Sequence, residues 1–141
     1  MEGVGYRGVN EPNRLQFEIP MLPPSVNHYV QHKAQGVHVK TAQAKAFERD
    51  FPLFSRGGFV IGEQFSVVFH FVPGPGDKGD VDNRNKCLLD CIAKAGMLRN
   101  RKGKELSDAW VKRMVVEIHD SAEERRTGPR TVVQIEALVW Q

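Results

Sequence analysis

The sequence has little cysteine, and no apolar run in it is long enough to cross a membrane. Its 141 residues include two cysteines, Cys87 and Cys91, four positions apart. A structural zinc site needs further ligands, so we expect both thiols in the core on one helix, with no structural disulfide. No stretch approaches the ~20 apolar residues of a spanning helix. The N-terminus lacks the pattern of a signal peptide, so we expect a cytoplasmic protein with no membrane partner.

Positive charge is concentrated in a few short segments of the chain. The net charge is +3 and the pI is about 9.0. The segment RNRKGKE, Arg99–Glu105, holds four cations and one anion. A mildly basic balance is weak evidence for a nucleic-acid partner, and such runs are usually solvated loops. Length and composition indicate one globular domain, which we place at 14–141 after a flexible N-terminal arm at 1–13.

Hydrophobic periodicity predicts four main strands. Residues 14–19 alternate between polar and apolar, and residues 64–72 are rich in β-branched and aromatic side chains. Two more strands are expected at 109–119 and 131–140, and the short polar segment between them predicts a C-terminal antiparallel hairpin. The sequence therefore predicts a single α+β domain, with two main helices packed on a mixed β-sheet.

Capping and stop signals define the two predicted helices. Thr41 is expected to cap the first, which a Gly-Gly pair ends, and Pro52 is expected to break or kink its last turn. The second is expected to start from a cap at Asp82 or Asn83 and to run to about Ala95. Both helices should place an apolar stripe on the sheet.

The segment GDVDNRNKCLLD, residues 79–90, contains three aspartates in an otherwise basic chain. Asp80 and Asp82 are two positions apart, so their side chains point the same way in an extended chain. Two close carboxylates repel each other unless one is protonated or a cation lies between them, and such hard oxygen ligands suit Mg²⁺ or Mn²⁺. Asp82, Lys86 and Asp90 form one stripe at helical spacing. The same residues are also compatible with a helix cap and an exposed ion-pair ladder.

This spacing resembles the RusA family of Holliday-junction resolvases, small endodeoxyribonucleases common in phages and prophages. The family pattern is an aspartate pair separated by one residue, then Asn, Lys, Asp and a Lys-Ala-Gly at fixed intervals. Here it corresponds to Asp80–Lys86, Asp90 and Lys94–Gly96. A second family element, a Pro-Pro-Ser-x-Asn loop followed by Tyr, corresponds to residues 23–29, with one residue instead of two between Asn and Tyr. The resemblance covers roughly residues 15–139.

The third acidic residue of the family pattern is less clear in this chain. Family members have an aspartate shortly after the Lys-Ala-Gly, and Asp108 occupies that place. The family's short Trp-x-Asp-Asp link is replaced here by a longer basic insert, residues 98–107, and Ser107 stands where the first of the paired acids is expected. Glu105 is therefore the alternative third acid.

The resemblance implies a Mg²⁺-dependent homodimer, with Mn²⁺ as a substitute ion, that binds four-way DNA junctions and nicks two strands symmetrically. It assigns metal binding to Asp80, Asp82 and Asp108. Lys86 is the fourth catalytic residue, and it would stabilise the transition state or orient the attacking water. Supporting roles fall to Asn83, Asp90, Asn27 and Tyr29.

We expect a set of basic residues to contact the phosphates of the DNA backbone. Phosphate contacts give affinity and salt dependence rather than sequence choice, so we expect binding to weaken steeply as salt is added. The assigned residues are Lys33, Lys40, Arg84, Arg99, Arg101, Lys102 and Lys104.

Two other functions fit the same residues. The first is a catalytically inactive protein that binds junctions or single-stranded DNA, with structural aspartates; the altered third-acid region favours it. The second is a metal nuclease that cleaves flaps or RNA. Both differ from a resolvase in a cleavage assay, because the first does not cut and the second does not require a four-way structure.

Two further candidate sites are disfavoured by spacing. The segment GPGDKGD, residues 74–80, is Gly-rich and follows a strand, but it lacks the Gly-Lys-Ser/Thr ending of a phosphate-binding loop. The five histidines show no metal-ligand spacing. We expect His70, inside a predicted strand, to be structural, and only His28, on the Pro-rich loop, to approach the site.

Overall fold

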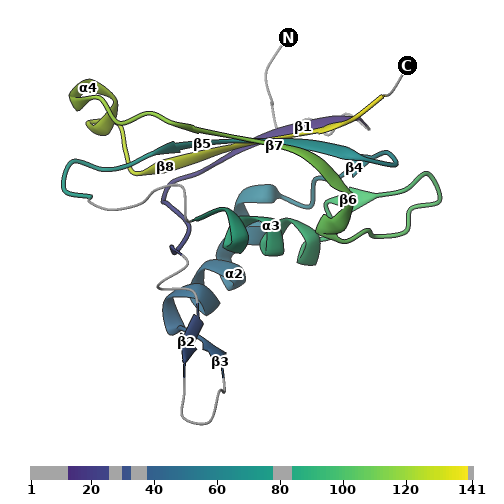
Figure 1. Ribbon diagram of the computed structural model, residues 1–141, viewed down its shortest axis with the longest axis horizontal. Helices are drawn as coiled ribbons and strands as arrows, with labels where there is room; N and C mark the ends of the chain where they lie inside the picture. The colour runs from purple at the N-terminus through teal and green to yellow at the C-terminus, as the bar shows by residue number, and fades with distance from the viewer. Residues whose placement is uncertain (1–12, 26–29, 33–37, 78–83, 140–141) are drawn as a thin grey trace.

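A four-stranded mixed sheet is the main layer of the protein (Figure 1). The computed structural model describes residues 13–25, 30–32, 38–77 and 84–139. The strand order is β1-β8-β5-β7, in which β8 is antiparallel to β1 and β5, and β5 is parallel to β7. The strands are β1 (Arg14–Ile19), β5 (Phe65–Val72), β7 (Val111–Ile118) and β8 (Arg130–Ala137).

Two main helices lie beneath one face of this sheet (Figure 1), which confirms the predicted α+β fold. They are α2 (Ala42–Ser55) and α3 (Asn85–Lys94). Smaller elements complete the fold: antiparallel β2 (Val30–His32) and β3 (His38–Lys40), parallel β4 (Val60–Ile61) and β6 (Leu98–Arg99), the 3₁₀ helix η3 (Asp108–Trp110), and the single-turn helix α4 (Ala122–Arg125).

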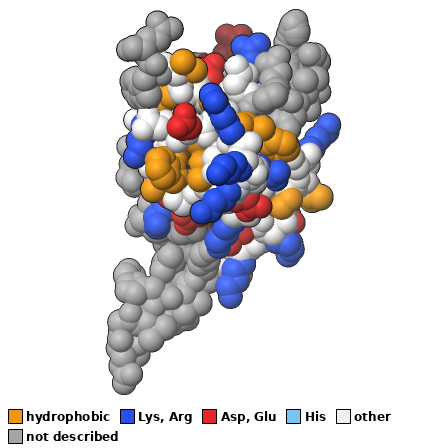
Figure 2. All heavy atoms as spheres, turned by 90° about the vertical axis from the view of Figure 1, so that its right-hand side faces the viewer, with side chains coloured by type: hydrophobic (Ala, Val, Ile, Leu, Met, Phe, Trp, Pro, Cys, Tyr) orange, Lys and Arg blue, Asp and Glu red, His pale blue; other side chains and the backbone are white. Residues whose placement is uncertain are grey.

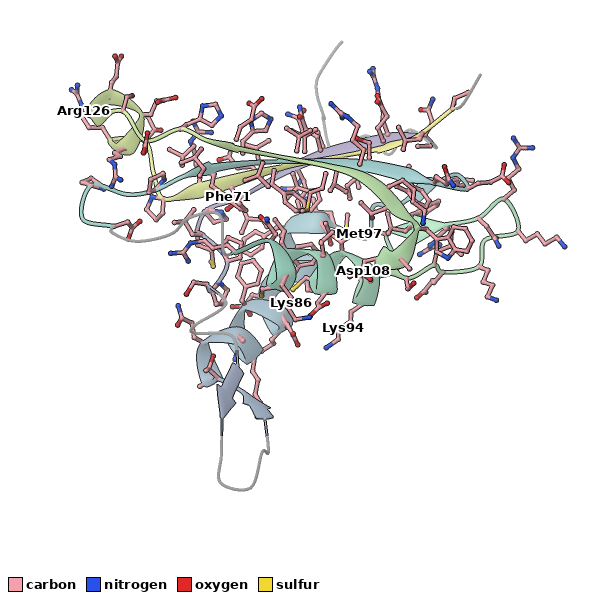
Figure 3. The ribbon with its side chains drawn as sticks, in the orientation of Figure 1. Phe71, Lys86, Lys94, Met97, Asp108 and Arg126 are labelled. Atoms are coloured by element: carbon pink, nitrogen blue, oxygen red, sulfur yellow. The ribbon has the colours of Figure 1, made fainter. Side chains whose placement is uncertain are left out.

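The core lies between the sheet and the two helices. Phe69 and Phe71 on β5 have no exposed surface, because β5 is flanked by strands on both sides and covered below by the helices. Phe71 and Met97 point into this layer (Figure 3). His70 lies between the two phenylalanines and faces the other side of the sheet, where it is only half-buried. One face of the sheet is therefore the core, and the other is open and polar.

Helix α2 begins where the sequence predicts and continues past its proline. The Thr41 hydroxyl accepts a hydrogen bond from the Ala44 amide at 3.1 Å, so the predicted cap is confirmed. Pro52 does not break the helix, because its carbonyl still accepts the Arg56 amide at 2.9 Å and the buried Phe51 before it holds the last turn in the core. The helix ends at Ser55, and Arg56 follows in the left-handed conformation, with φ of 55°.

The predicted C-terminal hairpin is wrong. The last two long strands, β7 and β8, run antiparallel but are not neighbours, since β5 lies between them and pairs with both. The connection 119–129 includes α4 and is long enough to pass over the end of β5. The strongly apolar β5 gains most by taking the interior position, where both of its edges are paired.

Helix α3 carries both cysteines into the core, as predicted. Cys87 and Cys91 are 1% and 3% exposed, beside the fully buried Leu88 and Ile92. The hydrogen bond with Cys87 and burial both raise the pKa of the Cys91 thiol, so this sulfur remains neutral. The helix begins at Asn85, slightly later than predicted. Within the described residues, no helix is long and apolar enough to cross a membrane.

Candidate metal and nucleic-acid site

Several predicted site residues lie outside the described part of the chain. These are Asp80, Asp82, Asn83, Asn27, Tyr29 and Lys33, and the side chain of Lys40 on β3 belongs with them. The structure does place the segments that border them, together with Lys86, Asp90, Asp108 and the basic residues from Arg84 to Lys104. The described residues therefore define the borders of the candidate site.

The start of α3 is joined to the Pro-rich loop. Arg84, in the N-cap position of α3, donates from its guanidinium to the carbonyl of Pro23. Thr131 on β8 anchors the same loop by donating to the Met21 carbonyl at 2.8 Å. The two sequence elements on which the family resemblance depends are thus in contact, although 61 positions separate the bonded residues.

Two buried polar atoms at the start of α3 have no hydrogen-bond partner among the described residues. They are Nε of Arg84 and Oδ1 of Asn85. Burial lowers the pKa of Arg84, partly offset by Asp77, but a guanidinium remains charged in proteins. A buried charged donor and a buried amide oxygen are costly without partners, so we expect groups outside the described residues, from the chain or from a ligand, to bind these two atoms.

Lys86 and Asp90 are one helical turn apart on the polar side of α3. Lys86 Nζ lies 4.0 Å from Asp90 Oδ2, and the Lys86 side chain is 64% exposed. An exposed pair at this distance contributes little to stability. The ammonium group therefore lies near Asp90 and stays accessible to a ligand, and Figure 3 places Lys86 on the helix-covered side of the sheet.

The two candidates for the third acid have different surroundings. Asp108 is half-buried and is the first residue of η3, which packs against α3. The Ser107 hydroxyl caps η3 by accepting the Ala109 amide at 3.3 Å. The Glu105 carboxylate instead lies over Gly96, just past the C-terminal end of α3; a Cβ built on Gly96 would be 2.8 Å from Glu105 Cδ. Asp108 lies on the helix-covered side of the sheet, as Lys86 does (Figure 3).

The basic insert forms a closed turn at one end of the molecule (Figure 1). Asn100 Oδ1 accepts the amides of Lys102 at 2.9 Å and Lys104 at 3.0 Å, which fixes the turn. Arg99 is used internally: its Nε donates to the Gly96 carbonyl at 2.8 Å, and its guanidinium lies 4.1 Å from the centre of the Phe59 ring. Three exposed cations remain for a ligand, Arg101, Lys102 and Lys104. Lys and Arg side chains are prominent on this end of the molecule (Figure 2).

Replacing Gly96 by Ala is expected to lower the free energy of unfolding by about 1–2 kcal/mol. Gly96 has φ of 68°, a conformation that costs a residue with a Cβ about that much. The Glu105 carboxylate is the flexible end of a side chain and can move aside, so the backbone term dominates. Urea unfolding measures the change. Gly76→Ala is the control, because Gly76 has open space around it; equal stability of the two variants would contradict this account.

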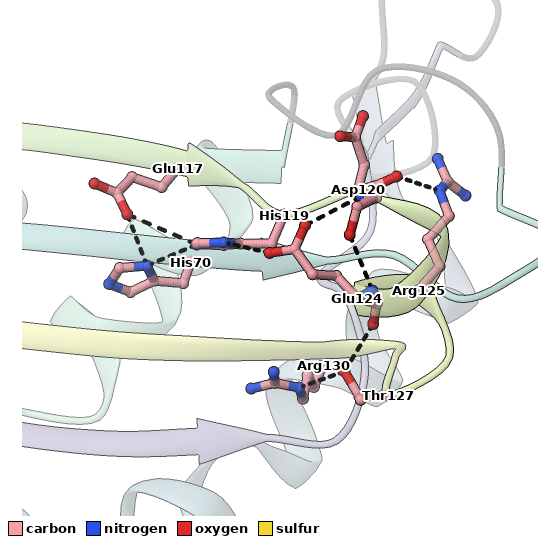
Figure 4. A network of polar contacts seen from close by, with 9 residues as sticks. His70, Glu117, His119, Asp120, Glu124, Arg125, Thr127 and Arg130 are labelled. Carbon is pink, nitrogen blue, oxygen red and sulfur yellow. Dashed lines mark hydrogen bonds and ion pairs between the residues drawn. The ribbon is translucent and has the colours of Figure 1, made fainter.

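Sequence reasoning missed a cluster of His70, Glu117 and His119 on the open face of the sheet (Figure 4). His70 Nδ1 lies 3.1 Å from His119 Nε2 and 3.1 Å from Glu117 Oε1, and the last two atoms are 3.7 Å apart. Glu117 and His119 are two positions apart near the end of a strand, which was a weak local signal. His70 is 49 positions from His119, and only the parallel pairing of β5 with β7 brings it to them.

No family model matches the chain, and no curated protein matches it. The class of protein is therefore defined by its own structure: an α+β domain with one helix-covered face, an aspartate-rich segment before α3, and exposed cations in the turn after β6.

Proposed function

We propose that this chain is a Mg²⁺-dependent, structure-selective endodeoxyribonuclease of the RusA type, which acts in the cytoplasm as a homodimer and resolves four-way DNA junctions. The observation that carries the proposal is the hydrogen bond from Arg84 to the Pro23 carbonyl. It brings the Pro-rich loop to the start of α3, directly after the aspartate-rich segment. Two motifs far apart in the sequence thus belong to one place in the fold, as a shared site requires.

The residues present fit a hard divalent cation. Asp80, Asp82 and Asp108 offer carboxylate oxygens, and Asn85 adds a buried amide oxygen without a partner among the described residues. Mg²⁺ bound there would lower the pKa of a water molecule and neutralise charge on the phosphate. These donors point to Mg²⁺ or Mn²⁺ rather than to zinc.

Lys86 and Arg84 then have distinct roles beside the scissile phosphate. The exposed ammonium of Lys86, 4.0 Å from Asp90 Oδ2, stabilises the additional negative charge of the pentacovalent transition state. The guanidinium of Arg84, which binds the Pro23 carbonyl, places a second positive charge at the start of α3 beside Lys86. Asn83 and Asp90 have supporting roles in this proposal.

The basic turn would extend the DNA-binding surface beyond the site. Arg101, Lys102 and Lys104 are exposed on a turn that Asn100 holds closed. Such cations bind phosphates without reading bases. Two copies of the site at a fixed separation in a dimer would match the two symmetric strands of a junction, so the preference for junctions comes from shape.

The test is a cleavage assay on a labelled four-way junction and on a linear duplex of matched sequence. We expect paired symmetric nicks on the junction alone, with Mg²⁺ present, and loss of cleavage with EDTA or in Asp82→Asn. Tight junction binding without nicks in any divalent ion would contradict the proposal and identify a DNA-binding protein. Equal cleavage of flaps, RNA or linear duplex would identify a nuclease of different specificity.

A further inference from the structure

The cluster of His70, Glu117 and His119 lies on the face of the sheet opposite to α3. His70 is between Phe69 and Phe71, whose side chains point into the core, and Glu117 is its register partner on β7. His119 follows β7 and donates its backbone amide to the Phe71 carbonyl at 2.9 Å, which continues the pairing for one more residue. Paired β-strands therefore hold all three side chains in place, rather than a mobile loop.

In each imidazole, the outer nitrogen, which is the ring nitrogen that faces away from the other histidine, is bound to an oxygen acceptor. His70 Nε2 lies 3.0 Å from Gln134 Oε1, and the Gln134 amide is oriented by donating its NH₂ to Gln16 at 2.9 Å. His119 Nδ1 lies 3.0 Å from Glu124 Oε2. The Ser121 amide donates to Glu124 Oε1 at 3.1 Å, which orients this carboxylate toward His119. Both outer nitrogens therefore carry protons.

The inner nitrogens, His70 Nδ1 and His119 Nε2, then carry lone pairs. These lone pairs point toward each other and toward Glu117 Oε1. The ring centroids are 5.3 Å apart, whereas His70 Nδ1 and His119 Nε2 are 3.1 Å apart, so the nitrogens and not the ring faces meet. Three acceptors at this range repel one another unless a cation lies among them. A single water could donate to only two of them.

We propose that His70, Glu117 and His119 form a second metal site, which binds a borderline divalent transition metal such as Zn²⁺. In a tetrahedral site with bonds of about 2.0–2.1 Å, adjacent ligand atoms lie about 3.3 Å apart. The three separations of 3.1, 3.1 and 3.7 Å bracket that value. An acceptor behind each histidine, as Gln134 and Glu124 provide here, is the usual partner of a metal-binding imidazole.

The ligand set selects a different metal from the one proposed near α3. Two imidazoles and one carboxylate favour zinc or a neighbouring transition ion over Mg²⁺. Glu117 is 52% exposed and His119 is 35% exposed, so an ion can enter from solvent and keep one position for water. The bound ion would fasten the end of β7 to β5. This inference does not depend on the proposed nuclease activity.

The experiment measures Zn²⁺ and Co²⁺ binding to the metal-free full chain by equilibrium dialysis and by visible absorption of the Co²⁺ form. Glu117→Gln keeps the size of the side chain and weakens its ligand oxygen; we expect it to weaken binding more than tenfold and to remove the tetrahedral Co²⁺ bands. His70→Gln should do the same. Circular dichroism checks that each variant is folded.

Matched controls separate this site from incidental binding. Glu136→Gln removes an exposed carboxylate from the same face of β8, and His32→Ala with His38→Ala removes the two histidines paired between β2 and β3. Both controls should bind Zn²⁺ as the wild type does. Binding that is equal in Glu117→Gln and the wild type, or no binding to the wild type, would overturn the proposal and leave a cluster held together by a shared proton.

Discussion

Replacing Asp108 by Asn is expected to slow junction cleavage by more than about 100-fold, whereas Glu105→Gln should retain most of the wild-type rate. Losing even a partner that only positions a metal ligand costs about 10–100-fold, so losing a ligand should cost more. Helix α3 has 10 residues and is about 15 Å long. The aspartate segment precedes the N-terminal end of α3, whereas the Glu105 carboxylate lies over Gly96, just past the C-terminal end. Asp108 lies on η3, which returns to pack against α3.

Single-turnover cleavage at saturating Mg²⁺ measures both variants, and junction binding in Ca²⁺ shows whether the DNA still binds. An amide replaces a carboxylate of the same size in each variant, so the pair is matched. If Glu105→Gln lost activity and Asp108→Asn kept it, the third acid would be Glu105. If both kept full activity, the third metal ligand would not come from this part of the chain.

Replacing Leu88 by Ala is expected to lower the free energy of unfolding by about 2–5 kcal/mol, the range for a buried leucine whose space is only partly refilled. Leu88 is completely buried on α3 and is part of the core cluster between the helices and the sheet. Domains of this kind are stable by about 5–15 kcal/mol, so one substitution would remove a large share. The position of α3 relative to the sheet depends on this contact.

Leu53→Ala makes the same chemical change at a site that is 71% exposed on α2. We expect a change within about 0.5 kcal/mol for this surface position. Urea unfolding followed by tryptophan fluorescence and circular dichroism compares the two variants. A similar loss in both would mean that helix propensity, rather than burial, determines the cost, and the packing of α3 would have to be reconsidered.

Local signals in the sequence predicted the elements well. Strand β1 has the predicted bounds, because its alternation of polar and apolar residues matches a sheet with one covered face. Thr41 caps α2, and the apolar stripe of α3 places Leu88 and Ile92 in the core. Each of these features depends on side chains within a few positions of one another, which is the range that periodicity and capping describe.

The order of strands and the histidine cluster could not be predicted in this way. Polar residues between two strands suggest a hairpin, yet the energy that places β5 between β7 and β8 comes from burying β5 on both edges. His70 looked structural because its partners, Glu117 and His119, are distant in the sequence. The pairing of β5 with β7 decides both results, and it is a property of the whole fold.

Only some features of the proposed nuclease site could be predicted from the sequence. Spacing identified Lys86 and Asp90, and the structure places them one turn apart on the polar side of α3. Arg84 and Arg99 were assigned to DNA phosphates, and the structure shows protein contacts for both, with the Pro23 carbonyl and with Gly96 and Phe59. Whether they also contact DNA stays a prediction. Residue type alone does not reveal which cations the fold uses internally.

Hydrogen bonds between polar side chains on the open face also fix the register of three neighbouring strands of the sheet. His70, Gln134 and Gln16 form one continuous chain of side-chain hydrogen bonds that crosses β5, β8 and β1 in turn. A slip of one residue in any of these strands would turn its polar member into the core and an apolar residue outward. Each buried group left without a partner would cost about 1–3 kcal/mol. Misaligned sheets are thereby excluded by directional bonds as well as by the hydrophobic core.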